Sequence, residues 1–157
     1  RELRRRGVTV NLIICGEGPE LAALRRTFGD DDRVKLTGRV ARQDLPVVYS
    51  LADLFVFPST MDTFGMAVLE AQSCGLPALV TNVGGPQEII APDETGYVLP
   101  AGRRDAWVEA VVRVRERMLR NPRWIVSVRQ ASRKRVKERF SWDDAIDDFF
   151  KAVPKIR

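Results

Sequence analysis

The sequence predicts an α/β fold, with helices on both faces of an open, mostly parallel β-sheet. Short apolar runs alternate with stretches of helical periodicity, which is the pattern of strands joined by crossover helices. The runs over 8–15 and 54–57 are mainly apolar rather than alternating, as expected for parallel strands buried on both faces. The chain has 157 residues, enough for one domain with a hydrophobic core.

In the first half of the chain, two apolar runs predict strands over residues 8–15 and 54–57, and they stop at Gly16 and Pro58, residue types that end a strand. A further short strand is predicted over 33–36, closed by Thr37-Gly38-Arg39. Between the runs, apolar residues at helical spacing predict helices over 21–28 and 45–51.

The second half continues the alternation, with a helix over 65–74, a strand over 78–81, a helix over 85–90 and a strand over 96–99. The helix over 65–74 is almost wholly apolar, so we expect it to be buried.

Two or three helices then complete the chain. An apolar stripe over 107–118 is broken by Asn121-Pro122, and a basic helix follows to about residue 140. Ser141 opens a last helix over 141–157, whose apolar face consists of Trp142, Ile146, Phe149, Phe150 and Val153. We expect this face to pack in a core or against another domain.

Composition excludes several classes of function. The chain has no histidine, so it holds no histidine-based catalytic triad or histidine metal site. Its two cysteines predict neither a disulfide framework nor a zinc site, and no Asp-x-Asp pair suits magnesium. No apolar run is long enough for a membrane span, and the first residues do not form a signal peptide, so we expect a cytoplasmic protein.

The net charge of +5 is concentrated in one segment. Residues 113–139 hold eleven Lys or Arg against Glu116 and Glu138. A solvated helical face explains this run most simply, and an anionic membrane surface, such as the inner face of a membrane, is the sharper alternative. Nucleic acid is not expected as a partner, because Trp124 is the one aromatic residue among the basic ones and no nucleic-acid-binding motif occurs.

Residues 58–90 carry most of the chemistry. Two carboxylates, Asp62 and Glu70, bracket the tight turn Thr63-Phe64-Gly65, and a helix opens at the glycine. Free backbone N–H groups at a helix N-terminus attract phosphate, while carboxylates accept hydrogen bonds from hydroxyl groups. One short segment can therefore bind an anion and a polyol together, as a nucleotide sugar requires.

This segment resembles the donor-binding motif of retaining glycosyltransferases of the GT-B fold, the family 4 group. The matching residues, in order, are Pro58-Ser59, Asp62, Phe64-Gly65, Glu70-Ala71, Cys74-Gly75-Leu76-Pro77, Gly84-Gly85 and Glu88. Asp62 departs from the usual form of the motif, which has Glu at this position. The resemblance extends from about Val8 to Phe140 and implies the Rossmann-like, donor-binding C-terminal half of such an enzyme.

The resemblance also implies roles for the site residues. Glu70 accepts hydrogen bonds from the ribose, and Asp62 lies near the hydroxyls of the donor sugar, where it favours positive charge at the anomeric carbon. Asp62 also fits as the cap of the turn that follows it. Backbone N–H groups that bind sugar and diphosphate are implied at Thr63, Phe64, Gly65 and Met66.

Two earlier loops complete the predicted site. Gly16 and Gly18 follow the first strand, while Gly38, Arg39 and Val40 follow the second. Loops after parallel strands lie on one rim of the sheet, where ligands bind. The resemblance implies that both loops approach the donor, although a simple tight turn and a surface arginine are the alternative interpretations.

The sequence thus predicts one nucleotide-sugar-binding domain over residues 1–157, acting without metal or cofactor on a UDP- or GDP-sugar. The family implies hexosyl transfer with retention, together with an N-terminal acceptor domain and a first strand that do not occur in this chain, so we expect the chain alone to be inactive. The alternatives are a sugar-nucleotide epimerase, a non-catalytic nucleotide-sugar-binding module and a dehydrogenase-like domain. The last lacks the third glycine of its fingerprint, because Leu21 stands there.

Overall fold

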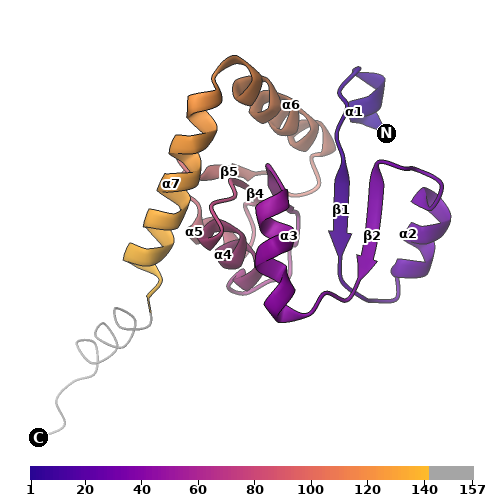
Figure 1. The fold of residues 1–157 in the computed structure, drawn as a ribbon, viewed down its shortest axis with the longest axis horizontal. Coiled ribbons are helices and arrows are strands. Elements are labelled where there is room, and N and C mark those ends of the chain that lie inside the picture. The colour runs from indigo at the N-terminus through magenta and orange to yellow at the C-terminus, as the bar shows by residue number, and fades with distance from the viewer. Residues whose placement is uncertain (142–157) are drawn as a thin grey trace, which may run out of the picture. The chain divides into compact units, whose positions relative to one another are not determined.

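A computed structural model describes residues 1–141, and the predicted helix over 141–157 lies, apart from Ser141, outside them. The described chain divides into two compact units, residues 1–48 and residues 49 onward. Both units alternate parallel strands with helices (Figure 1), so the predicted α/β class is confirmed. Among the described residues, no helix is long and apolar enough to cross a membrane.

The first unit contains a two-stranded parallel sheet. Its elements are α1 (Glu2–Arg5), β1 (Leu12–Cys15), α2 (Leu21–Phe28), β2 (Val34–Gly38), a 3-10 turn (Arg42–Asp44) and the start of α3 (Leu45–Leu51). Strand β1 begins four residues later than the predicted start at Val8, because its pairing with β2 begins only at Leu12 opposite Val34.

The second unit contains a three-stranded parallel sheet in the order β3-β4-β5. Its elements are β3 (Phe55–Phe57), α4 (Met66–Ser73), β4 (Ala78–Thr81), α5 (Pro86–Ile89), β5 (Gly96–Leu99), α6 (Arg104–Arg120) and α7 (Pro122–Arg139). The predicted bounds of β4 and β5 are confirmed, and the other elements end within a few residues of their predicted bounds. The strands of the described residues form two sheets, one in each unit, where the sequence predicted one.

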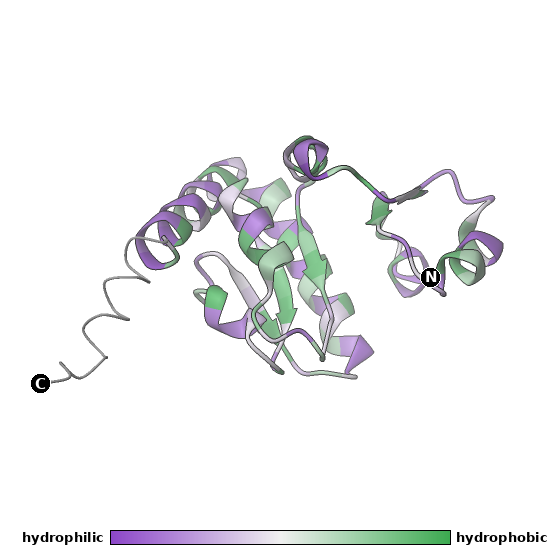
Figure 2. Ribbon diagram, turned by 90° about the horizontal axis from the view of Figure 1, so that it is seen from below, coloured by the Kyte–Doolittle hydropathy of each residue, from purple (hydrophilic) through white to green (hydrophobic). Residues whose placement is uncertain are grey.

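Strand β4 is the centre of the second unit, and all four of its residues are fully buried. Ala78 and Val80 pack in one apolar cluster with Val68 of α4 and Ile89 of α5. Leu79 packs in another cluster with residues of α6 and α7. Because successive side chains of a strand point to opposite faces, α4 and α5 cover one face of the sheet and α6 and α7 the other. In Figure 2 the strands of this sheet are coloured mainly as hydrophobic, whereas the helices around them carry both hydrophobic and hydrophilic residues.

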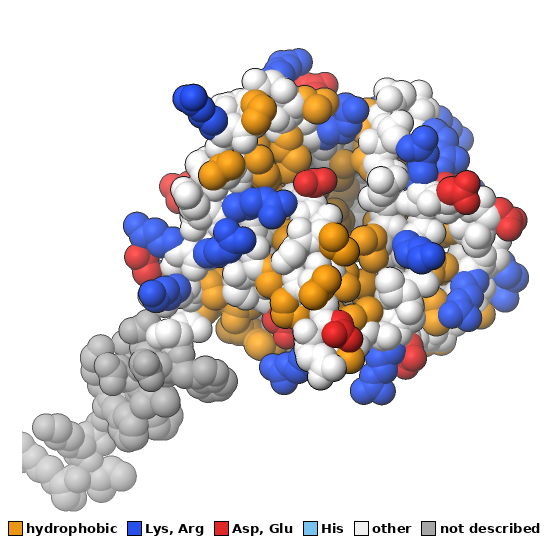
Figure 3. Space-filling model, viewed as in Figure 1, with side chains coloured by type: hydrophobic (Ala, Val, Ile, Leu, Met, Phe, Trp, Pro, Cys, Tyr) orange, Lys and Arg blue, Asp and Glu red, His pale blue; other side chains and the backbone are white. Residues whose placement is uncertain are grey.

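Helix α7 explains part of the basic segment. Three of its arginines donate to backbone carbonyls where other helices end: Arg129 Nη2 to Ala52 O (2.9 Å), Arg133 Nη2 to Cys74 O (2.9 Å) and Arg135 Nε to Ile89 O (2.6 Å). The last carbonyls of a helix have no partner within the helix and carry partial negative charge, so a guanidinium stabilises them. Figure 3 shows further Lys and Arg side chains along the exposed side of α7.

We expect Arg135→Met to lower the free energy of unfolding by about 1 to 2 kcal/mol, because Arg135 is half-buried and donates to Ile89 O and also to Glu88 O at 3.0 Å. The measurement is urea unfolding followed by circular dichroism. Arg123→Met, at an exposed position of the same helix, is the control and should change stability by less than about 0.5 kcal/mol. Equal losses in both variants would contradict this role of Arg135.

Candidate functional site

The site begins at the turn formed by residues 62–66, which joins β3 to α4. The carboxylate of Asp62 accepts two hydrogen bonds through Oδ1, from the N–H of Phe64 at 3.1 Å and from the N–H of Gly65 at 2.5 Å. This is the capping geometry that favours Asp at such a position. The cap interpretation of Asp62 therefore describes its contacts in this structure. Among the described residues, no hydrogen bond reaches its second oxygen, Oδ2.

The N-terminus of α4 keeps part of its donor capacity. The carbonyl of Gly65 accepts from Val68 and Leu69 at 2.9 and 3.0 Å, which closes the first turn of the helix. Of the N–H groups predicted to bind a donor, those of Phe64 and Gly65 are bonded to Asp62. The N–H groups of Met66 and Ala67 come next in the chain and have no partner within the helix. These two groups give the N-terminus its positive character.

Three glycines shape this turn. Gly65 has a φ of +96°, and a Cβ there would lie 3.0 Å from Pro86 Cγ of α5. A Cβ at Gly84 would lie 2.4 Å from Asp62 O, and one at Gly85 would lie 2.1 Å from Thr63 O. The glycine pair after β4 thus allows the 62–66 turn to pack directly on the backbone at the start of α5. Both glycines therefore lie just before α5, where the 62–66 turn leaves no room for a side chain.

Glu70 lies one turn into α4, on the same face as Met66, because residues four apart share a helix face. Its side chain is half-buried, and its Oε2 accepts a hydrogen bond from the hydroxyl of Tyr49 in α3 at 3.3 Å. Among the described residues, Glu70 forms no ion pair. An acid placed in this way, half-shielded and without a neutralising cation, keeps its capacity to accept hydroxyl hydrogen bonds.

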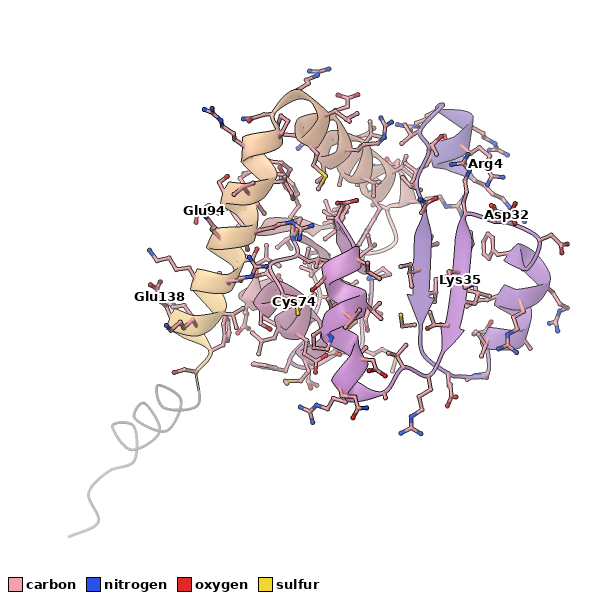
Figure 4. All side chains as sticks on the ribbon, viewed as in Figure 1. Arg4, Asp32, Lys35, Cys74, Glu94 and Glu138 are labelled. Carbon is pink, nitrogen blue, oxygen red and sulfur yellow. The ribbon has the colours of Figure 1, made fainter. Side chains whose placement is uncertain are left out.

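Helix α4 carries two further polar groups behind this site. Gln72 is fully buried and donates through Nε2 to Thr95 O at 2.8 Å, which ties the helix to the loop before β5. Cys74, where α4 ends (Figure 4), is a free thiol. The pKa of the Cys74 thiol is raised overall. Partial burial is the main cause, the Arg133 guanidinium opposes it, and the Glu70 carboxylate adds to it. This thiol is therefore not activated as a nucleophile.

The remaining predicted residues belong to the first unit. Gly16 and Gly18 follow β1, and Arg39 and Val40 follow β2. The N–H of Gly16 donates to Gly38 O at 2.8 Å, so the two loops lie together at the carboxyl ends of their strands, as the sequence predicts. Arg39 is exposed and Val40 is half-buried. The predicted site residues are thus divided between the units, with Asp62 to Glu70 in the second.

The first unit also has a pocket of about 830 Å³ at the opposite end of its sheet. Leu12 and Val34, the first residues of β1 and β2, line it together with Arg4 and Asp32 (Figure 4). Ligands of parallel sheets bind beyond the carboxyl ends of the strands, and this pocket is at the amino ends. Among the described residues, no cluster of His, Cys, Asp or Glu could hold a metal ion.

We expect Gly85→Ala to destabilise the chain by about 2 kcal/mol or more, because the added Cβ would collide with backbone atoms of Thr63 and Phe64, which lie at 2.1 and 2.8 Å. Thermal or urea unfolding measures this loss. Gly18→Ala is the matched control, since nothing lies within 4 Å of its added Cβ. Wild-type stability of the Gly85 variant would refute the close packing of the turn.

Comparisons with known proteins identify the family of this chain. The sequence profile described as "Glycosyl transferases group 1" matches residues 1–117. A curated relative from Mycobacterium tuberculosis, named GDP-mannose-dependent alpha-(1-6)-phosphatidylinositol monomannoside mannosyltransferase, is 34% identical over 151 residues, covering 90% of this chain and 38% of the relative.

Solved structures agree in fold. Sucrose-phosphate synthase from Thermosynechococcus elongatus superposes with a TM-score of 0.74 at 28% identity, covering 90% of this chain and 38% of that one. Anabaena HepE, solved in complex with UDP, superposes with a TM-score of 0.73 at 20% identity, which shows the fold alone, over 92% of this chain and 41% of that one. The chain spans less than half of each of these proteins, and by its sequence it belongs to the group 1 glycosyltransferases.

Proposed function

We propose that this chain is the donor-binding part of a glycosyltransferase that uses a UDP- or GDP-sugar. The observation that carries the proposal is the 62–66 turn, where an acid-capped helix N-terminus stands one helical turn from the half-buried carboxylate of Glu70. The name of the mycobacterial relative states that it depends on GDP-mannose, and HepE was solved with UDP. Both names support a nucleoside diphosphate as the common part of the ligand.

In this proposal, different residues of the site bind different parts of the donor. The N–H groups of Met66 and Ala67 receive the diphosphate, whose charge suits the positive end of α4. Glu70 accepts hydrogen bonds from the ribose diol, and such bonds are strong because the acceptor is ionised. Asp62 lies at the sugar end and favours positive charge at the anomeric carbon. For Gly16, Gly18, Arg39 and Val40, a role in donor binding stays a prediction from the sequence.

The proposed reaction transfers a hexosyl group to an acceptor with retention at the anomeric carbon. The bond from the anomeric carbon to the diphosphate oxygen breaks, and the diphosphate leaves with the bonding electron pair. The helix N–H groups stabilise that developing charge. We propose that the acceptor binds to a part of the enzyme outside this chain, so the chain alone should bind donor without transferring sugar.

Calorimetric titration of the chain with UDP, GDP and ADP tests the proposal. One nucleotide should bind, and Glu70→Ala should weaken it about tenfold or more, equal to about 1.4 kcal/mol. Glu94→Ala, at an exposed acid in the turn before β5 (Figure 4), is the control and should leave the affinity unchanged. The proposal fails if none of the three nucleotides binds, or if both variants bind like the wild type.

We further propose that binding requires no divalent cation, because the helix N–H groups and basic side chains supply the positive charge that the diphosphate needs. The affinity for the nucleotide should therefore be the same, within about twofold, with excess EDTA and with millimolar magnesium. The same titration repeated in both buffers measures this. Binding that disappears in EDTA and returns with magnesium would contradict a metal-independent site.

A further inference from the structure

Tyr49 approaches the site from a different helix. It lies in α3, and its hydroxyl donates to Glu70 Oε2 of α4 at 3.3 Å, across 21 residues of sequence. Both side chains are half-buried. From this contact we propose that Tyr49 is a positioning residue, which holds the Glu70 carboxylate in the orientation that receives the ribose diol. The inference rests on the function proposed above.

The contact leaves the carboxylate able to bind a ligand. An ionised carboxylate has two oxygens and about four sites that accept hydrogen bonds. Tyr49 engages one of these sites on Oε2, and Oε1 accepts no hydrogen bond from the described residues. The hydroxyl therefore fixes one oxygen while the other remains for the hydroxyls of a ribose.

In this proposal, the hydrogen bond from Tyr49 pre-organises the Glu70 side chain for ligand binding. A glutamate side chain has three rotatable bonds, and fixing them when a ligand binds costs conformational entropy. A hydrogen bond formed before the ligand arrives reduces this cost, as outer partners of catalytic and metal-binding side chains do. Tyr49 acts through Glu70 and needs no contact with the ligand itself.

The structure also fixes Tyr49. Its ring meets Phe55 of β3 edge-on, with centroids 5.7 Å apart and planes at 83°. The N–H of Ala52 donates to Tyr49 O at 3.2 Å, and Ala52 O accepts from Arg129 of α7 at 2.9 Å. The ring and backbone are thus held by contacts that do not involve the hydroxyl, so Tyr49→Phe should keep these contacts and remove the hydrogen bond to Glu70.

The experiment is a double-mutant cycle on nucleotide affinity, measured by calorimetry on the chain with the nucleotide among UDP, GDP and ADP that binds. Tyr49→Phe should weaken binding about threefold to tenfold, the range of one hydrogen bond. In the Glu70→Ala background, the same change should have no further effect, because its route to the ligand is gone. Tyr97→Phe is the matched control: it removes the hydroxyl of the only other tyrosine, which accepts from Arg117 Nη1 at 3.3 Å.

A second ligand isolates the ribose. The 2′,3′-dideoxy form of the same nucleotide lacks the diol, so wild type and Tyr49→Phe should bind it equally. A merely structural role of Tyr49 would weaken both ligands, would persist without Glu70, and would overturn the inference.

The two levels of the proposal fail separately. Nucleotide binding that depends on Glu70 but is unchanged in Tyr49→Phe overturns the role of Tyr49 and leaves the proposed function standing. If no nucleotide binds, or if binding is independent of Glu70, both proposals are overturned.

Discussion

The burial of β4 is the constraint on which the second unit depends. This strand has a neighbour on each side and an apolar cluster on each face, and no side chain in it is exposed. Each of its large aliphatic side chains contributes about 1.5 to 3 kcal/mol by leaving water. A strand held from four directions has a fixed end at Thr81, and Gly84 and Gly85 follow after two further residues. The position of the 62–66 turn is therefore determined by the core of the unit.

A second layer of support comes from α7. This helix is distant in sequence from α3, α4 and α5, yet three of its arginines donate hydrogen bonds to the backbone carbonyls of residues 52, 74 and 89. Each bond covers a helix terminus that would otherwise face solvent or apolar surface with unpaired acceptors. The planar guanidinium suits this role better than an ammonium, because it offers several donors in fixed directions. Part of the positive charge of the chain thus has a structural role, because these arginines bind carbonyls within the fold.

Sequence reasoning was most accurate where burial alone determines structure. The bounds of β4 and β5 follow from apolar runs between turn-forming residues, and the break between α6 and α7 follows from Asn121-Pro122. Strand β1 was predicted too long, because an apolar run does not indicate which residues find a partner strand. The family motif predicted the position of the 62–66 turn. The cap role of Asp62 was predicted separately, from the preference of Asp for such turns.

Other contacts had no signal in the sequence. Tyr49 precedes Glu70 by 21 residues in an ordinary short helix, and nothing in its surroundings indicates that the two side chains meet. The burial of Gln72 is a second example, because the residue type alone does not indicate which partner would satisfy its amide. Its partner is a backbone carbonyl, Thr95 O, and every residue type supplies one. Such pairings depend on distances that only the folded chain sets.

The cap made by Asp62 has a consequence for how the site meets its ligand. With its carboxylate bonded to Phe64 and Gly65, the start of α4 already holds an anion of its own. This carboxylate holds the turn through hydrogen bonds within the protein, without a contribution from any ligand. Under the proposed function, an incoming phosphate would meet donors arranged in advance and also the negative charge of the Asp62 carboxylate, which would repel it. Selectivity then favours ligands with a polyol as well as a phosphate, because the anion alone gains least from such a site.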